Sequence, residues 1–162
     1  GFLAVWVIGY GGVQGAAPLL LRAATAGTAP GPRLTGALAF ALAAVTALIP
    51  LGLALGWAPS VTMLGGLALF GGLFALNSAV HSYLVLAYSE SDRVSMTVGF
   101  YYMANACGRL LGTLLSGVLY QFAGVGASLW GAVVLAACAG AAALTLPPVT
   151  GGASWSGVKS DD

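Results

Sequence analysis

Long apolar runs without a charge are the feature that most constrains the fold of this chain. Of its 162 residues, 59% are hydrophobic and only 6% are charged, and the charges lie mostly between the runs. A soluble domain carries roughly 25% charged residues, so this chain cannot supply a water-facing surface. A membrane-spanning helix, in contrast, needs about 20 consecutive and mainly apolar residues. The sequence therefore predicts an integral membrane protein.

Five of these runs are long enough to cross a bilayer as helices. Proline, glycine or charged residues separate them, as is typical of the links between helices. The alternation of apolar and polar residues that marks the strands of a membrane β-barrel is absent from the sequence. We therefore expect an all-α membrane protein with five transmembrane helices, at residues 2–21, 34–57, 61–88, 94–120 and 127–146.

Basic residues predict the orientation of these spans. With five spans, the links after the first and third spans lie on the same side of the membrane as the tail. That side holds most of the basic residues, namely Arg22, Arg33, Arg93 and Lys159. Because lysine and arginine accumulate in cytoplasmic loops, we expect this side to be cytoplasmic. Residues 1–146 would then form a helical bundle, and residues 147–162, which begin with two prolines, a disordered cytoplasmic tail.

A single charge, Arg109, interrupts the fourth span. At 1.5 Å per residue it lies roughly 22 Å from the cytoplasmic end of that span, too deep to reach either interface easily. An arginine at mid-membrane costs about 2.5–3.5 kcal/mol on insertion scales. No aspartate or glutamate occurs inside any expected span. We therefore expect an anionic ligand as its partner, with a backbone carbonyl or an ion pair to an absent part of the protein as the alternatives.

Polar residues on two spans predict a cavity for an elongated anion. Tyr101, Asn105 and Arg109 follow i,i+4 spacing and share one helix face. Asn77 and His81 share a face of the third span, and Asn77 lies at about the same depth as Asn105, about 17 Å from the cytoplasmic end. A cavity between the two spans would place two amides at mid-depth and cationic groups at two depths. For His81, a hydrogen bond between helices is the alternative to a role in binding or proton relay.

Other candidates are less specific. In the first span, Tyr10 and Gln14 lie at helical spacing with Trp6, which suits either a cavity wall or aromatic packing. The pairs Gly65–Gly66 and Gly71–Gly72 in the third span suit close contact between helices. Small residues that recur every four positions are the signature of close helix packing. We expect such packing at two stripes of small residues, Gly11 and Gly15, and Ala104, Gly108, Gly112 and Ser116.

The sequence holds no pattern for soluble enzyme chemistry. It contains no P-loop, nucleophile elbow or metal-ligand cluster, and it has one histidine only. It also lacks a basic patch for nucleic acid. We therefore expect no enzymatic activity, no cofactor, no metal and no nucleic-acid partner, and we expect a small anionic substrate and the lipid bilayer as partners. A membrane scaffold without transport activity is the alternative from a different class.

Residues 77–121 closely resemble the ArsJ-type organoarsenical efflux permeases of the major facilitator superfamily; they read NSAVHSYLVLAYSESDRVSMTVGFYYMANACGRLLGTLLSGVLYQ. The start of the chain, GFLAVWVIGYGGVQGAAP, is similar as well. The resemblance implies that the five spans are helices eight to twelve of a twelve-helix transporter, the C-terminal part of that fold. Spans one, three and four would line its cavity. The first seven helices of the same protein would then be missing, as the abrupt apolar start also suggests.

The resemblance also implies a substrate and a location. The family is associated with export of 1-arseno-3-phosphoglycerate, an anion with two oxyanion groups, across the bacterial cytoplasmic membrane, which confers resistance to arsenate. The expected function is therefore secondary transport of an organoarsenical anion, with the C-terminus in the cytoplasm. Export of another phosphorylated or carboxylated metabolite, or of drugs, is the alternative within the same superfamily.

Overall fold

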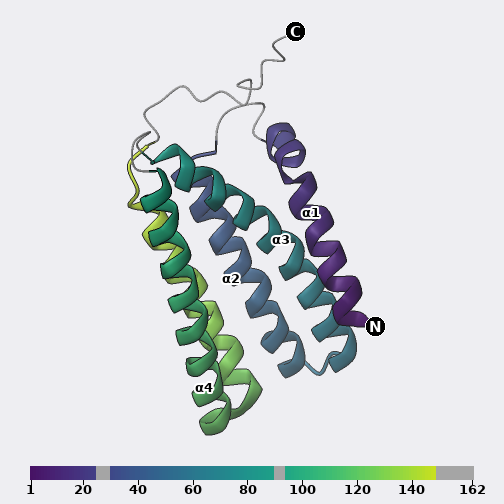
Figure 1. Ribbon diagram of the computed structural model, residues 1–162. Coiled ribbons are helices and arrows are strands. Elements are labelled where there is room, and N and C mark those ends of the chain that lie inside the picture. Colours follow the sequence, from purple (N-terminus) through teal and green to yellow (C-terminus); the bar gives the residue numbers. More distant parts are fainter. Residues whose placement is uncertain (25–29, 90–93, 149–162) are drawn as a thin grey trace.

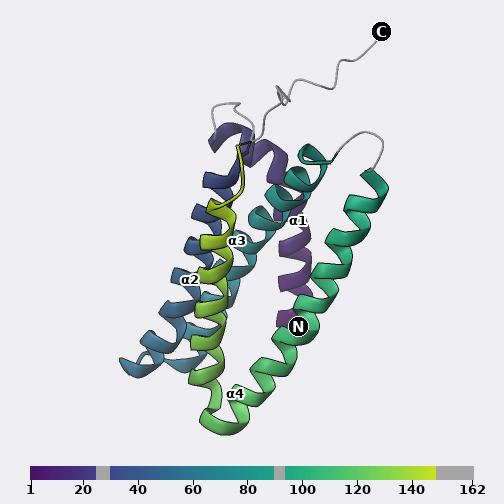
Figure 2. The ribbon, with the colours of Figure 1, turned by 90° about the vertical axis from the view of Figure 1, so that its left-hand side faces the viewer.

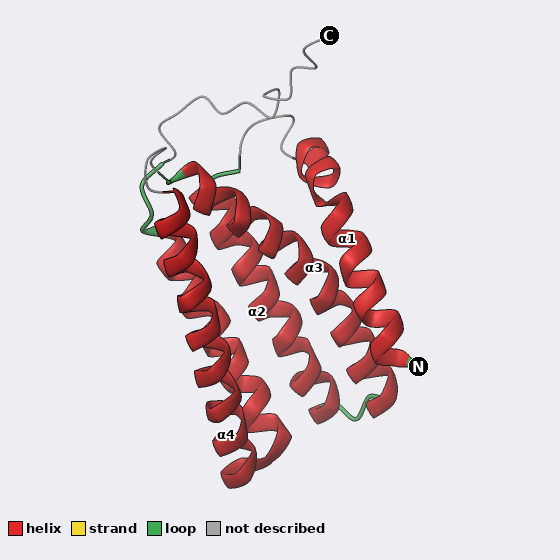
Figure 3. Ribbon diagram, viewed as in Figure 1, coloured by secondary structure: helices red, strands yellow, loops and turns green. Residues whose placement is uncertain are grey.

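The structure, a computed structural model, describes residues 1–24, 30–89 and 94–148. Within these residues it contains helices and no strand (Figure 3). The helices are α1 (Phe2–Ala24), α2 (Pro32–Ala54), α3 (Pro59–Ala87) and α4 (Val94–Leu144) (Figure 1). All four are long and apolar enough to cross a membrane. The prediction of an all-α chain built from membrane-length helices is confirmed, and the expected tail lies almost wholly outside the described residues.

Gly56 ends α2 and produces the sharp turn into α3. Its φ of 79° lies in the left-handed region, which glycine adopts without strain. The Gly56 N–H bonds to the Leu53 carbonyl at 3.1 Å, and the Trp57 N–H bonds to the Gly52 carbonyl at 3.0 Å. This pair of bonds is a Schellman motif, which satisfies the last carbonyls of a helix. The second span therefore ends earlier than its apolar run, and Pro59 begins the next helix, where its missing N–H is not needed.

The fourth helix is one element of 51 residues with a sharp break inside it. Ala123 (φ −144°, ψ 16°) and Gly124 (φ 75°, ψ −169°) leave the helical region, and the chain folds back on itself there (Figure 2). We call residues 94–122 the descending arm and residues 125–144 the returning arm. The sequence predicts two separate helices joined by a longer link. The structure keeps helical conformation up to both sides of the break, so the described chain has four helical elements and the expected count of five is not confirmed.

The helices lie side by side in an order that differs from their order in the sequence. α3 lies between α1 and α2, and α2 also packs along α4 (Figures 1 and 2). Among the described residues, the backbone of α1 contacts neither α2 nor α4. A buried cluster of Ala17, Leu21, Val80 and Leu84 joins α1 to α3, and Leu34 of α2 packs against it. The helix α3 therefore has neighbours on both sides.

Glycines on α3 allow both neighbouring helices to approach it closely. A Cβ added at Gly71 would lie 2.7 Å from the indole nitrogen of Trp6 in α1. A Cβ added at Gly66 would overlap the side chain of Ile49 in α2. At the other member of each glycine pair, a Cβ would meet nothing within 4 Å. The close contact predicted for the two pairs is therefore confirmed for one glycine of each.

The returning arm of α4 packs on α2 at two glycines, one on each helix. A Cβ at Gly36 would lie 2.7 Å from Cδ2 of Leu144. A Cβ at Gly140 would lie 3.2 Å from the ring of Phe40. Gly36 belongs to no repeated small-residue stripe, whereas Gly140 ends a stripe with four-residue spacing, Ser128, Ala132, Ala136 and Gly140. The missing side chains at Gly36 and Gly140 therefore allow the returning arm to approach α2 closely.

Candidate functional site

The anion-binding residues predicted for the fourth span lie along the descending arm of α4. Asn105 and Arg109 are exposed, and Tyr101 is half-buried beside Tyr102, with 5.6 Å between the two ring centroids. No residue of this arm is buried within the described chain. The polar face of the arm is therefore an open surface of the described chain.

Arg109 has no partner for its charge among the described residues. Its guanidinium makes no hydrogen bond there, and its backbone carbonyl accepts one from the Thr113 hydroxyl at 2.8 Å. All acidic residues of the sequence lie outside the described ranges, so these ranges hold no carboxylate side chain. A cation removed from water needs an anion or a strong acceptor nearby. The group that balances Arg109 must come from outside the described residues.

His81 forms a hydrogen bond within its own helix. Its Nδ1 lies 2.9 Å from the backbone carbonyl oxygen of Asn77, one turn earlier in α3. Because a carbonyl can only accept, Nδ1 is the donor in this contact. A hydrogen bond from His81 to another helix, the alternative considered above, does not form among the described residues.

Asn77 carries a buried polar atom that lacks a partner. Within the described ranges, its side-chain oxygen is buried and makes no hydrogen bond. An unpaired buried group of this kind costs about 1–3 kcal/mol. A flip of the amide would place the nitrogen there instead, and that atom would need a partner as well. Asn77 is therefore the buried position at which a ligand, a water or another segment would supply a missing hydrogen bond.

Replacing Asn77 by leucine tests whether that missing partner is the cargo. The change removes an unpaired buried group at similar volume, so the melting temperature in detergent should stay the same or rise. Loss of one hydrogen bond worth about 1 kcal/mol to a transported anion should lower transport roughly fivefold. Ser82→Ala is the matched control, because the exposed Ser82 hydroxyl bonds to the Ser78 carbonyl of its own helix at 3.0 Å. A large drop in the melting temperature of the Asn77 variant would instead indicate a structural partner.

Tyr10 packs in a row of aromatic rings between α1 and α3. Its ring centroid lies 5.9 Å from that of Trp6 and 6.0 Å from that of Phe74, which in turn lies 5.6 Å from that of Phe70. A cavity of about 270 Å³ opens beside Trp6 and Tyr10. Gln14 is half-buried one turn further along α1 and does not line this cavity. The ring contacts favour the packing alternative for Tyr10.

The two stripes of small residues have different surroundings. Gly112 and Ser116 line a cavity of about 150 Å³ between the two arms of α4. The Ser128 hydroxyl of the returning arm donates to the Ser116 carbonyl at 2.9 Å. Ala104 is exposed, and a Cβ would meet nothing within 4 Å at the remaining glycines of the stripes, Gly11, Gly15 and Gly108. Packing at these positions stays a prediction about neighbours outside the described residues.

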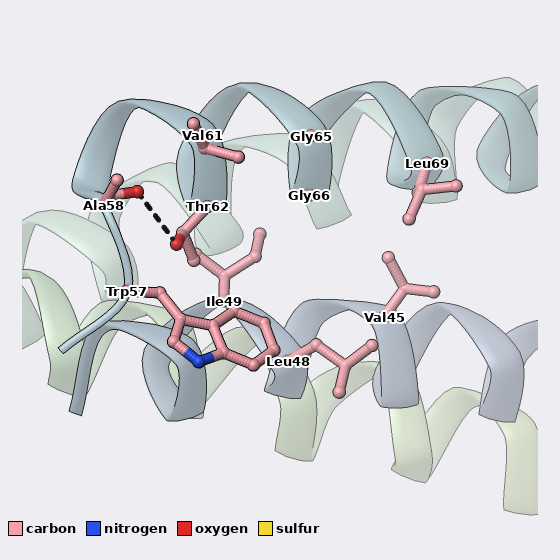
Figure 4. Close-up of a pocket in the computed structure, with 10 residues that line it drawn as sticks. All are labelled: Val45, Leu48, Ile49, Trp57, Ala58, Val61, Thr62, Gly65, Gly66 and Leu69. Carbon is pink, nitrogen blue, oxygen red and sulfur yellow. Dashed lines mark hydrogen bonds between the residues drawn. The ribbon is translucent and has the colours of Figure 1, made fainter. Parts of the chain in front are cut away.

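A larger cavity of about 350 Å³ lies between α2 and α3 (Figure 4). Its lining side chains are apolar except for the indole N–H of Trp57 and for Thr62, whose hydroxyl donates to the Ala58 carbonyl at 3.1 Å. No charged residue lines it. Its chemistry suits an apolar occupant and not an anion.

The polar candidates therefore occupy three separate places in the described chain. Tyr101, Asn105 and Arg109 lie on the descending arm, Asn77 and His81 lie on α3, and Tyr10 and Gln14 lie on α1, where Tyr10 contacts Phe74 of α3. None of the three cavities described above is lined by a residue of the first two groups. Nor do three or more possible metal ligands come together anywhere in the described ranges. An anion site built from these residues is not closed without further groups.

These features define the class of the molecule: an α-helical chain with membrane-length helices and an exposed arginine that has no charge partner among the described residues. Comparisons with protein-family models, with curated proteins and with solved structures found no match. Function is therefore inferred from the residues of this chain.

Proposed function

We propose that this chain is the C-terminal part of a secondary transporter that exports an organic anion, and that Arg109 binds the anion. The observation that carries the proposal is an exposed cation on an otherwise uncharged helical arm, with no counter-charge among the residues that the structure describes. Arginine binds carboxylate and phosphate-like oxyanions through two parallel N–H···O bonds. Ionisable residues inside membrane helices commonly mark the path of a substrate or ion.

The open face of the descending arm is one wall of the proposed pathway. The opposite wall would come from helices upstream of residue 1, which would also cover the open glycines of α1. Alternating access would then rock the two halves around the bound anion. Asn77, whose buried side-chain oxygen has no hydrogen-bond partner within the described ranges, is the second candidate to contact the cargo.

The proposed cargo is 1-arseno-3-phosphoglycerate, and the proposed location is the bacterial cytoplasmic membrane with the C-terminus inside. The resemblance of residues 77–121 to ArsJ-type permeases of the major facilitator superfamily supports this choice. A cargo with two oxyanion groups also suits polar positions on two helices. Another phosphorylated or carboxylated metabolite is the second candidate, because an arginine recognises those oxyanions in the same way.

Uptake by everted membrane vesicles tests the proposal on the full-length protein. Vesicles should accumulate arsenic when a glyceraldehyde-phosphate dehydrogenase generates the organoarsenical outside them from arsenate and a triose phosphate, with NAD⁺ as the oxidant. They should not do so with arsenate alone, or when the protein is absent. Uptake of a different phosphorylated metabolite without arsenic would favour the second candidate. Uptake of a neutral drug without either anion would contradict anion export, and no uptake at all would favour a scaffold.

A further inference from the structure

The cavity between α2 and α3 is an apolar groove with one end at the α2–α3 turn (Figure 4). Trp57 and Ala58 lie at that end, and Val45 and Leu69 face each other at the other end (Figure 4). Trp57 is 57% exposed. Tryptophan concentrates at the boundary between the bilayer and water. The groove therefore extends from a membrane boundary into the apolar layer.

Adjacent glycines explain why this part of the bundle is hollow. Gly66 faces Ile49 so closely that a Cβ would overlap that side chain, and the two helices meet there. Gly65 also lines the groove, but a Cβ at this position would meet nothing within 4 Å. The missing side chain at Gly65 leaves open space beside a tight contact. The absence of a side chain at Gly65 therefore contributes to the hollow.

We propose that the groove holds an acyl chain of a membrane phospholipid. Water is a poor occupant, because the lining side chains offer it few partners: the Thr62 hydroxyl is already used on the Ala58 carbonyl, and the other polar group is the indole N–H of Trp57 at one end of the groove. An empty groove would forfeit the dispersion contacts of its walls. The medium around membrane-length helices is hydrocarbon, and a flexible unbranched chain fits lengthwise between two helices. This inference does not depend on the identity of the transported cargo.

Photolabelling in nanodiscs tests the acyl-chain site directly. The probe is a phosphatidylethanolamine with a diazirine in the middle of one acyl chain, mixed at low mole fraction into unlabelled lipid. After irradiation, peptide mapping should find several-fold more adducts on the groove residues than on the exposed apolar residues of the returning arm. Equal labelling of all exposed apolar surfaces would overturn the proposal, because it would show only the surrounding bilayer. Absence of adducts in the groove would overturn it as well, since another part of the protein would then fill the space.

Substitutions that fill or cover the groove, compared with a control substitution elsewhere, test the site further. Gly65→Leu places a side chain in the open space and should lower the groove adducts several-fold. Gly117→Leu is the control, because Gly117 is exposed, also has nothing within 4 Å of a Cβ, and lines none of the described cavities. Leu69→Trp, at an exposed position on the rim, covers the inner end of the groove and should lower the adducts as well. Unchanged groove labelling in both Gly65→Leu and Leu69→Trp would contradict the site.

Discussion

Replacing Arg109 by glutamine is expected to lower anion transport by roughly ten- to a hundredfold, given about 1.5–3 kcal/mol for a hydrogen bond to a charged group. Glutamine can still donate hydrogen bonds, but it has no charge to balance the cargo. Removing a cation from mid-membrane also lowers the cost of insertion, so the amount of protein in the membrane should not fall. Vesicle uptake normalised to that amount measures the effect.

Two further variants separate charge, geometry and position. Arg109→Lys keeps the charge but loses the planar, two-pronged contact, so an intermediate loss is expected. Arg33→Gln removes an exposed cation from the first turn of α2 and should transport like the wild type. Normal uptake by Arg109→Gln would overturn the assignment of Arg109 to the cargo. Reduced membrane level with normal uptake per molecule would instead show that Arg109 pairs with a carboxylate elsewhere in the protein.

Replacing Gly71 by alanine is expected to destabilise the contact between α1 and α3 by about 1–3 kcal/mol, the usual cost of overpacking. The new Cβ would lie 2.7 Å from Nε1 and 2.9 Å from Cε2 of Trp6, which belong to a rigid ring. The indole is held in place because it stacks on Tyr10 and donates its N–H to the Leu67 carbonyl at 2.8 Å. It therefore lies over the turn that ends at Gly71, where only a residue without a side chain fits.

The next residue in the chain is the control for this prediction. A Cβ at Gly72 would meet nothing within 4 Å, and alanine favours a helix over glycine by about 1 kcal/mol. Gly72→Ala should therefore keep or raise the melting temperature in detergent, and Gly71→Ala should lower it. In a Trp6→Ala background, Gly71→Ala should lower the melting temperature much less, because the indole that the new Cβ would overlap is absent. Equal effects at the two glycines would contradict the role of the indole.

The presence and length of the helices could be predicted because a long apolar run that lies in a bilayer forms a helix. Backbone N–H and C=O groups in hydrocarbon must find hydrogen-bond partners within the protein, and an α-helix supplies these partners within the segment itself. The residues at which the helices end could be predicted less well. The second span stops at Gly56, inside an apolar run, because a left-handed glycine with its two capping bonds ends the helix there. The link expected between the last two spans shrinks to a break at Ala123 and Gly124, since the residues on either side keep helical dihedral angles.

For the candidate site, the sequence could predict only which residues share one face of a helix. Spacing alone puts Asn105 and Arg109 on one face, and the structure adds that this face is open in the described chain. Spacing could not show that His81 bonds to its own helix or that the side-chain oxygen of Asn77 is buried without a partner. Those outcomes depend on which hydrogen-bond partners and which packing contacts the neighbouring segments bring to each side chain.

The sequence by itself determined a set of apolar, membrane-length helices with one cation inside the fourth, because hydrophobicity and helical spacing are local properties. The tertiary structure decided the order of the helices, the glycines that touch a neighbour and the groove beside Gly65. Glycines alike in sequence differ in surroundings because a close contact needs a particular partner. Trp6 meets the Leu67 carbonyl across 61 positions of the chain, and no local pattern at either residue specifies that meeting.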